Sequence, residues 1–172
     1  AGFPVEYYKD TLTGTTLCDY LTSKYEKQVS QYSFRAKGSG KSGLLTASHC
    51  GQEILSRTAC EITEKGITAR FFVGFPANGR TINATELEKI LFDFLPVCIQ
   101  KSFFYSSLNA KELQNYIELA EDQEFIRQTL PAKNLCAFIA DGSILPRESG
   151  ISSRPMKASI PFTSPDSLRI SI

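Results

Sequence analysis

The stretch TACEITEKGITARFFVGFP, residues 58–76, decides the fold class. Residues 58–63 and 67–75 are rich in β-branched and aromatic side chains, which favour strands. Lys65-Gly66 separates these two segments, and a glycine can supply the positive φ of a tight turn. The sequence therefore predicts a β-hairpin, which ends where Pro76 removes a backbone hydrogen-bond donor.

Helices are predicted on both sides of this hairpin. The apolar residues of 15–28 recur at helical spacing, and Asp19 falls on the other face, so we expect it to be solvent exposed. Asn83 and Asn109 are suited to capping two further helices, each of which begins at the next residue. The second of these runs to about residue 130, whereas the first is expected to break or kink at Pro96.

The last third of the chain is predicted to be mostly extended. Residues 135–140 form a short apolar run that is typical of a buried strand, and residues 143–155 form a long loop. Residues 160–162 and 168–172 are predicted as closing strands. We therefore expect residues 1–172 to be one α+β domain with two to three main helices and a mixed or antiparallel sheet.

Composition excludes several classes of protein. Of the 172 residues, 42% are hydrophobic and 22% are charged, which is ordinary for a globular domain and unlike a disordered chain or a coiled coil. No apolar run approaches the roughly 20 residues that span a bilayer, so no membrane partner is expected. With 19 Lys and Arg against 18 Asp and Glu, the chain has no global attraction to nucleic acid, and any such contact requires a local patch.

The cysteine pattern argues against a disulfide framework and against a zinc site. The five cysteines are odd in number, and no pair has C-x-x-C spacing. We therefore expect buried, reduced thiols and an intracellular, reducing compartment. No signal peptide is visible at the start of the sequence, and the only histidine, His49, is expected to be structural.

One glycine-rich segment resembles the end of a phosphate-binding loop: Gly38-Ser39-Gly40-Lys41-Ser42. The full motif is G-x-x-x-x-G-K-[ST], but Arg35 stands where the first glycine belongs, and no apolar strand precedes it. The backbone amides and Lys41 could still bind a nucleotide phosphate. Arg35, Lys37 and Lys41 could instead contact the phosphates of a nucleic acid, and a plain surface loop is a further alternative.

A second candidate site follows the apolar run 135–140. Asp141 stands at the end of that predicted strand, where open sheets often bind ligands, and it could also bind Mg²⁺. Arg147 is suited to bidentate contacts with phosphate or carboxylate, and Ser149 adds a hydroxyl. The structural alternative is that Asp141 only caps the turn through its side chain.

Several separated segments together resemble a known family. They are Gly38-Ser39-Gly40-Lys41-Ser42-Gly43, Gly51-Gln52-Glu53-Ile54-Leu55-Ser56-Arg57-Thr58, Val73-Gly74-Phe75-Pro76-Ala77-Asn78-Gly79-Arg80, Glu121-Asp122 and Asp141-Gly142-Ser143-Ile144-Leu145-Pro146-Arg147-Glu148-Ser149-Gly150. In this order they resemble the N-terminal region of the predicted ATPases of the ABC class. The resemblance runs from about Arg35 to the C-terminus and is poor before Arg35.

The resemblance implies an accessory domain that is not itself catalytic. In that family the working P-loop lies downstream, so ATP and Mg²⁺ would be bound mainly by a downstream ATPase domain of the same protein, and residues 168–172 would lead into an antiparallel subdomain. The full protein would be a homodimer that hydrolyses ATP, with RNA as a candidate partner. Lys41 and its glycine-rich loop would contact an anion, whereas Asp141, Arg147 and Ser149 would face the nucleotide domain or its ligand.

Two other functions remain open from the residues alone. One is a stand-alone NTPase that uses the incomplete P-loop of residues 38–42. The other is a nucleic-acid-binding module without ATP chemistry, whose affinity would fall steeply with salt.

Overall fold

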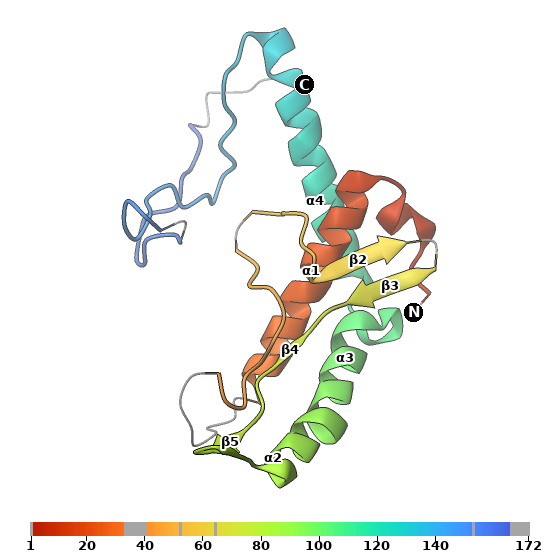
Figure 1. The fold of residues 1–172 in the computed structure, drawn as a ribbon. Helices are drawn as coiled ribbons and strands as arrows, with labels where there is room; N and C mark the ends of the chain where they lie inside the picture. Colours follow the sequence, from red (N-terminus) through yellow and green to blue (C-terminus); the bar gives the residue numbers. More distant parts are fainter. Residues whose placement is uncertain (1, 33–40, 52, 64, 153, 166–172) are drawn as a thin grey trace. The chain divides into compact units, whose positions relative to one another are not determined.

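The computed structural model of the chain describes residues 2–32, 41–51, 53–63, 65–152 and 154–165, which form two compact units, Ala1–Glu118 and Leu119–Ile172 (Figure 1). The elements are, in chain order, η1 (Val5–Tyr8), α1 (Thr11–Ser30), β1 (Leu45–Thr46), β2 (Cys60–Thr63), β3 (Gly66–Ala69), β4 (Phe72–Val73), β5 (Ala77–Asn78), β6 (Thr81–Ile82), α2 (Ala84–Glu88), η2 (Lys89–Phe94), α3 (Leu95–Phe103), η3 (Tyr105–Ser107), α4 (Ala110–Thr129) and η4 (Pro131–Lys133). Helices combined with short antiparallel strand pairs confirm the predicted α+β class.

The hairpin predicted around Lys65-Gly66 is present as β2 and β3. Ile62 pairs with Ile67, and Gly66 has a φ of 132°, a conformation that L side chains rarely adopt. The predicted strand 67–75 is, however, divided in two. Its second part, β4, leaves the hairpin and pairs with β1, where Leu45 lies opposite Val73.

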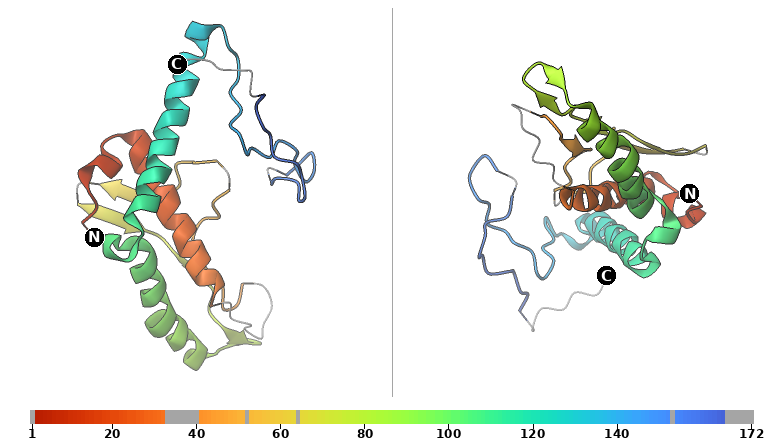
Figure 2. Two further views of the ribbon diagram at one scale, coloured as in Figure 1. Left: turned by 180° about the vertical axis from the view of Figure 1, so that it is seen from behind. Right: turned by 90° about the horizontal axis from the view of Figure 1, so that it is seen from below.

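Helix α1 is the centre of the first unit. The views from behind and below show α3 running beside α1, with the β2–β3 hairpin against the same helix (Figure 2). Leu17, Leu21 and Tyr25 are fully buried, as the helical spacing predicted. The ring of Tyr25 lies 4.5 Å from that of Phe71 and 5.9 Å from that of Phe103, so aromatic contacts join α1 to the segment before β4 and to α3.

The start of α1 is determined by a reciprocal cap. The backbone N–H of Thr13 donates to Asp10 Oδ1 at 2.8 Å, and the N–H of Asp10 donates to Thr13 Oγ1 at 3.2 Å. The bond from the Thr13 amide lowers the pKa of Asp10 below its ordinary value, because it favours the carboxylate form. The helix therefore begins four residues before the predicted residue 15, at Thr11.

We expect Asp10→Ala to lower the free energy of unfolding by about 1 kcal/mol at neutral pH, because the cap is lost. The Asp10 carboxylate contributes this stability above its unfolded pKa, and the contribution disappears as the pH falls through the lowered folded pKa. The difference between wild type and Asp10→Ala should therefore shrink in acid. Urea titrations from pH 7 to pH 2 measure it. Asp10→Asn, which caps without titrating, should show a flatter pH dependence than wild type, and a wild-type profile as flat as that of Asp10→Asn would contradict this role.

The helical run from Ala84 continues through Pro96. Asn83 caps it as predicted, since Asn83 Oδ1 accepts a bond from the Glu86 amide at 3.3 Å. Pro96 does not end the run, because the wider π-helical turn η2 precedes it and Pro96 falls in the first turn of α3. A missing N–H is tolerated at a helix start, so this proline is accommodated.

Helix α4 begins at its predicted cap, where Asn109 Oδ1 accepts a bond from the Glu112 amide at 3.2 Å. Within the first unit, Leu113 and Ile117 of this helix are buried in the core. Lys24 of α1 donates to both carboxylate oxygens of Glu112, at 2.8 and 2.9 Å. This ion pair holds the start of α4 against α1.

Two of the three strands predicted in the second unit are absent from the described residues. Residues 135–140 and 160–162 are extended but are not assigned to any strand, and residues 168–172 lie outside the described part. Gly142 N–H donates to the Phe162 carbonyl and Phe162 N–H donates to the Ser143 carbonyl, both at 2.8 Å, which pairs the two segments only locally. The apolar run lacks neighbouring strands that would bury it, so its side chains, including the thiol-bearing Cys136, are mostly exposed.

The cysteine prediction is confirmed for three residues. Cys18, Cys60 and Cys98 are buried free thiols, Cys50 is half-buried, and Cys136 is exposed. Within the described part of the chain, no helix is both long and apolar enough to cross a bilayer.

Candidate functional site

The residues that follow the glycine-rich segment are bound tightly to the chain around Gly74. Gly43 N–H donates to the Gly74 carbonyl at 2.8 Å, and Gly74 N–H donates to the Leu44 carbonyl at 2.6 Å. The Ala77 amide donates to Ser42 Oγ at 3.1 Å. The turn from Lys41 to Leu44 is therefore fixed on its neighbour by three hydrogen bonds.

Gly74 is required for this close approach. A Cβ at that position would lie 1.7 Å from the Lys41 carbonyl oxygen and 2.8 Å from its carbonyl carbon. Both atoms belong to the backbone, so a rotamer change cannot relieve the overlap. Close backbone approach, rather than a positive φ, explains the glycine between Val73 and Phe75.

Lys41 presents its charge next to one exposed aromatic ring. Its Nζ lies 5.0 Å from the centre of the Phe72 ring, within the range of a cation–π contact. Phe72 and Phe75 are 45% and 53% exposed. We call Lys41, Phe72 and Phe75 the Lys41 surface. The predicted contact residues Gly38, Ser39 and Gly40, together with the basic residues 35 and 37, lie outside the described residues.

The described part of this segment does not have the geometry of a P-loop. A P-loop leads from a strand into a helix, whose N-terminal amides bind the phosphates. Here Ser42 is followed by a turn and then by β1, not by a helix. The Ser42 hydroxyl, which would bind Mg²⁺ in a P-loop, already accepts the bond from Ala77. These residues therefore do not fit nucleotide and Mg²⁺ in the P-loop manner.

The second candidate site lies in the second unit. The Asp141 carboxylate accepts bonds from Ser164, at 2.6 Å from its amide and 3.0 Å from its hydroxyl. Arg147 forms an isolated bridge with Pro155, and the Ser149 carbonyl accepts a bond from the Ser152 amide at 3.2 Å. The Asp141 side chain thus binds a segment 23 residues later in the sequence. The side chains of Arg147 and Ser149 lie on an exposed loop.

Large apolar side chains surround these loop residues. Those that are strongly exposed in the loop region are Leu145, Ile151, Met156 and Ile160. A hollow of about 590 Å³ in the same unit is lined by Ile126, Phe138, Asp141 and Phe162 among others. An apolar surface of this kind is typical of a face that contacts other protein.

A buried polar network in the first unit was not predicted. Asp19 is only 3% exposed; it accepts a bond from Arg57 Nε at 3.3 Å and one from the Tyr116 hydroxyl at 3.2 Å. The prediction that Asp19 is solvent exposed is therefore wrong. Burial, with the nearby Asp19 charge, raises the pKa of Tyr116 well above its usual range, which keeps it a hydrogen-bond donor.

One sequence signal could have indicated this burial. Between Thr11 and Ser23 the helix carries a single charged residue, Asp19. A helix with so little charge is typically covered on more than one face. The partners of Asp19 come from residue 57 and from α4, distant in the sequence, so no local pattern could identify them.

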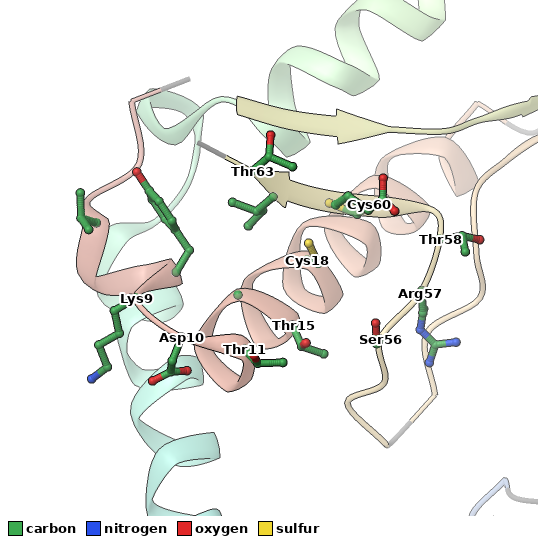
Figure 3. Close-up of a pocket in the computed structure, with 15 residues that line it drawn as sticks. Lys9, Asp10, Thr11, Thr15, Cys18, Ser56, Arg57, Thr58, Cys60 and Thr63 are labelled. Atoms are coloured by element: carbon green, nitrogen blue, oxygen red, sulfur yellow. The ribbon is translucent and has the colours of Figure 1, made fainter. Parts of the chain in front are cut away.

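A pocket of about 740 Å³ opens beside this network, between the first half of α1 and the segment that leads into β2 (Figure 3). Its wall includes Arg57, Thr15 and two cysteines, Cys18 and Cys60. Among the described residues, no group of three or more His, Cys, Asp or Glu side chains is arranged to hold a metal ion. The pocket is therefore lined by two thiols together with apolar and polar side chains, and its described residues do not form a metal centre.

Family models match nearly the whole chain. Residues 1–106 match the N-terminal region of ATPases of the ABC class, and residues 109–172 match the P-loop domain of the ABC ATPase. The chain belongs to the ABC-class ATPase family. The first match begins at residue 1, so it includes the segment before residue 35 that resembled the family poorly. A comparison with curated proteins gave no match.

Both matches lie on the same chain, so the N-terminal region of this ABC-class ATPase continues directly into sequence of a P-loop domain. The one Gly-Lys-Ser sequence, residues 40–42, falls within the N-terminal match. Residues 109–172 contain no Gly-Lys-Ser or Gly-Lys-Thr sequence.

Proposed function

We propose that this chain is the N-terminal accessory part of an ABC-class ATPase and that its Lys41 surface contacts RNA. ATP and Mg²⁺ would be bound and ATP hydrolysed by P-loop domain sequence beyond residues 109–172, in a homodimer with composite sites. The family membership supports the ATPase assignment. The misfit of Ser42 to a P-loop supports an accessory rather than a catalytic role for residues 41–44.

The single observation that favours RNA is the pairing of a cation with an exposed aromatic ring. Proteins that bind single strands combine positive charge for the backbone with aromatic faces on which bases stack. Lys41 lies over Phe72, and Phe75 is exposed close by in the sequence. The hydrogen bonds around Gly74 hold the Lys41 turn in place, so little ordering is required on binding.

The loop with Asp141, Arg147 and Ser149 is proposed to face the nucleotide domain. Support comes from the exposed apolar side chains of the same loop region, Ile151 and Ile160 above all, which would be covered by such a domain. We further propose a reducing intracellular compartment, since the cysteines among the described residues are free thiols.

We expect Lys41→Ala to weaken binding of a single-stranded oligouridylate by roughly fivefold to tenfold, the loss of about one phosphate contact. The slope of log K against log salt should also become shallower by about 0.7. Fluorescence anisotropy over a salt series measures both quantities. Lys111→Ala, which removes an equal charge from the exposed start of α4, is the matched control and should leave both unchanged.

Three outcomes would contradict the proposal in different ways. Equal affinities for wild type and Lys41→Ala would exclude the Lys41 surface as the RNA contact. Micromolar Mg-ATP binding by this chain in calorimetry, abolished in Lys41→Ala, would instead support a stand-alone NTPase. If the full-length protein bound RNA but did not hydrolyse ATP, the ATPase assignment would be excluded and a nucleic-acid-binding module would be the remaining function.

A further inference from the structure

Two thiols that are distant in the sequence meet between α1 and β2. Cys18 and Cys60 are 8% and 3% exposed, and both line the pocket of about 740 Å³. Figure 3 shows their sulfur atoms directed toward one another across the gap between helix and strand. They therefore form a buried pair that lies at the wall of a pocket large enough for small solutes.

The two thiols are chemically unequal. A hydrogen bond from Cys60 lowers the pKa of Cys18, and the same bond, together with burial, raises the pKa of Cys60. Cys18 is therefore the better nucleophile of the pair, because the thiolate is the reactive form. The third thiol nearby differs: burial raises the pKa of Cys50 to about 11, and its Sγ donates to the Asp19 carbonyl at 3.7 Å.

We propose that Cys18 and Cys60 are a peroxide-sensitive modification site that closes to a disulfide joining α1 to β2. The Cys18 thiolate attacks one oxygen of hydrogen peroxide, the O–O bond breaks, and the leaving hydroxide takes up a proton to become water. Cys60 then attacks the resulting sulfenic sulfur; the S–S bond forms, the S–O bond breaks, and a second water leaves with the Cys60 proton. The two thiols lose two electrons, and the peroxide gains them.

The arrangement gives this reaction a structural consequence. A bond between residues 18 and 60 would close a long loop of the unfolded chain and fix the hairpin to the central helix. Reduction would release it, so the link is reversible. This inference does not depend on the proposed RNA contact.

Peptide mapping tests the proposal on the chain without any substitution. Trypsin cleaves after Lys and Arg, so Cys18, Cys50 and Cys60 fall on the separate peptides 10–24, 42–57 and 58–65. After equimolar hydrogen peroxide and thiol blocking, we expect a linked pair 10–24 with 58–65, an intact mass lower by about 2 Da, and full reversal by dithiothreitol. The thermal unfolding midpoint should rise on oxidation and fall on reduction.

Two variants sharpen the test. Cys60→Ser removes the second thiol, so Cys18 should accumulate as sulfenic acid that dimedone traps. Cys136→Ser removes the exposed thiol and should leave the linked pair unchanged. The proposal is overturned if the linked peptides include 42–57 instead, if links occur only between chains, or if Cys18 is oxidised no faster than Cys98. If Cys60→Ser does not fold, peptide mapping of the unsubstituted chain still tests whether Cys18 and Cys60 become linked.

Discussion

Gly74→Ala is expected to lower the free energy of unfolding by about 3–5 kcal/mol, or to prevent folding of the first unit. The new Cβ would lie 1.7 Å from the Lys41 carbonyl oxygen and 3.1 Å from the Leu44 amide nitrogen. Two backbone segments would have to separate, and the bonds that join Gly74 to Gly43 and Leu44 would be lost. Urea denaturation followed by circular dichroism measures the change.

The same substitution at Gly14 is the matched control. Gly14 lies inside α1, and the nearest atom to an added Cβ is the Cβ of Tyr8 at 4.0 Å, an ordinary contact. Alanine is the better helix former, so Gly14→Ala should stabilise the chain by up to about 1 kcal/mol. Opposite signs for the two variants are expected; a Gly74→Ala protein as stable as wild type would show that the Lys41 turn is not packed against Gly74.

The parts of the fold that were predicted correctly depend on neighbours in the sequence. A capping asparagine bonds an amide three residues ahead, so Asn83 and Asn109 located two helix starts. The hairpin at Gly66 likewise follows from its own residues, because the turn and both strands lie within one short stretch. The π-helical turn before Pro96 has no such signature, and proline alone therefore suggested a break.

The parts of the fold that were predicted wrongly depend on neighbours in space that are distant in the sequence. The apolar run 135–140 has the composition of a buried strand, but a strand needs partners, and within residues 130–152 and 154–165 no strand is assigned. The prediction for Asp19 was wrong in the opposite sense: it was expected to be exposed, but partners at residues 57 and 116 bury it. In neither case does a local sequence pattern identify the partners on which the outcome depends.

In the candidate site, too, local sequence features were predicted correctly and contacts between distant residues were not. The glycine-rich segment was recognised from its composition, and the count that placed residue 35 where a glycine belongs already argued against a P-loop. The structure adds the reason that residues 41–44 are fixed: they contact Gly74, which is 30 or more residues away in the sequence. For Asp141, composition left a ligand role and a turn role equally open, and the structure adds a partner that the sequence did not indicate, Ser164, 23 residues later in the chain.

We expect Arg57→Met to lower the free energy of unfolding by about 3 kcal/mol, because it leaves the Asp19 carboxylate buried without its cation. Methionine keeps most of the aliphatic stem, so the loss reports on the charge and not on packing. Tyr116 alone still donates to Asp19, at 3.2 Å. The double variant Asp19→Asn with Arg57→Met should recover part of the loss, since no charge is then buried, and urea denaturation of the four proteins completes the double-mutant cycle.

Arg70→Met is the matched control for this cycle. Arg70 pairs with Glu61 at 2.6 Å, but the two side chains are 53% and 51% exposed. Water can solvate Glu61 once its partner is removed, so the change should stay below about 1 kcal/mol. A small effect of Arg57→Met, similar to that of Arg70→Met, would mean that solvent reaches Asp19. A large effect that Asp19→Asn relieves would show that the buried carboxylate connects the segment before β2 to both α1 and α4.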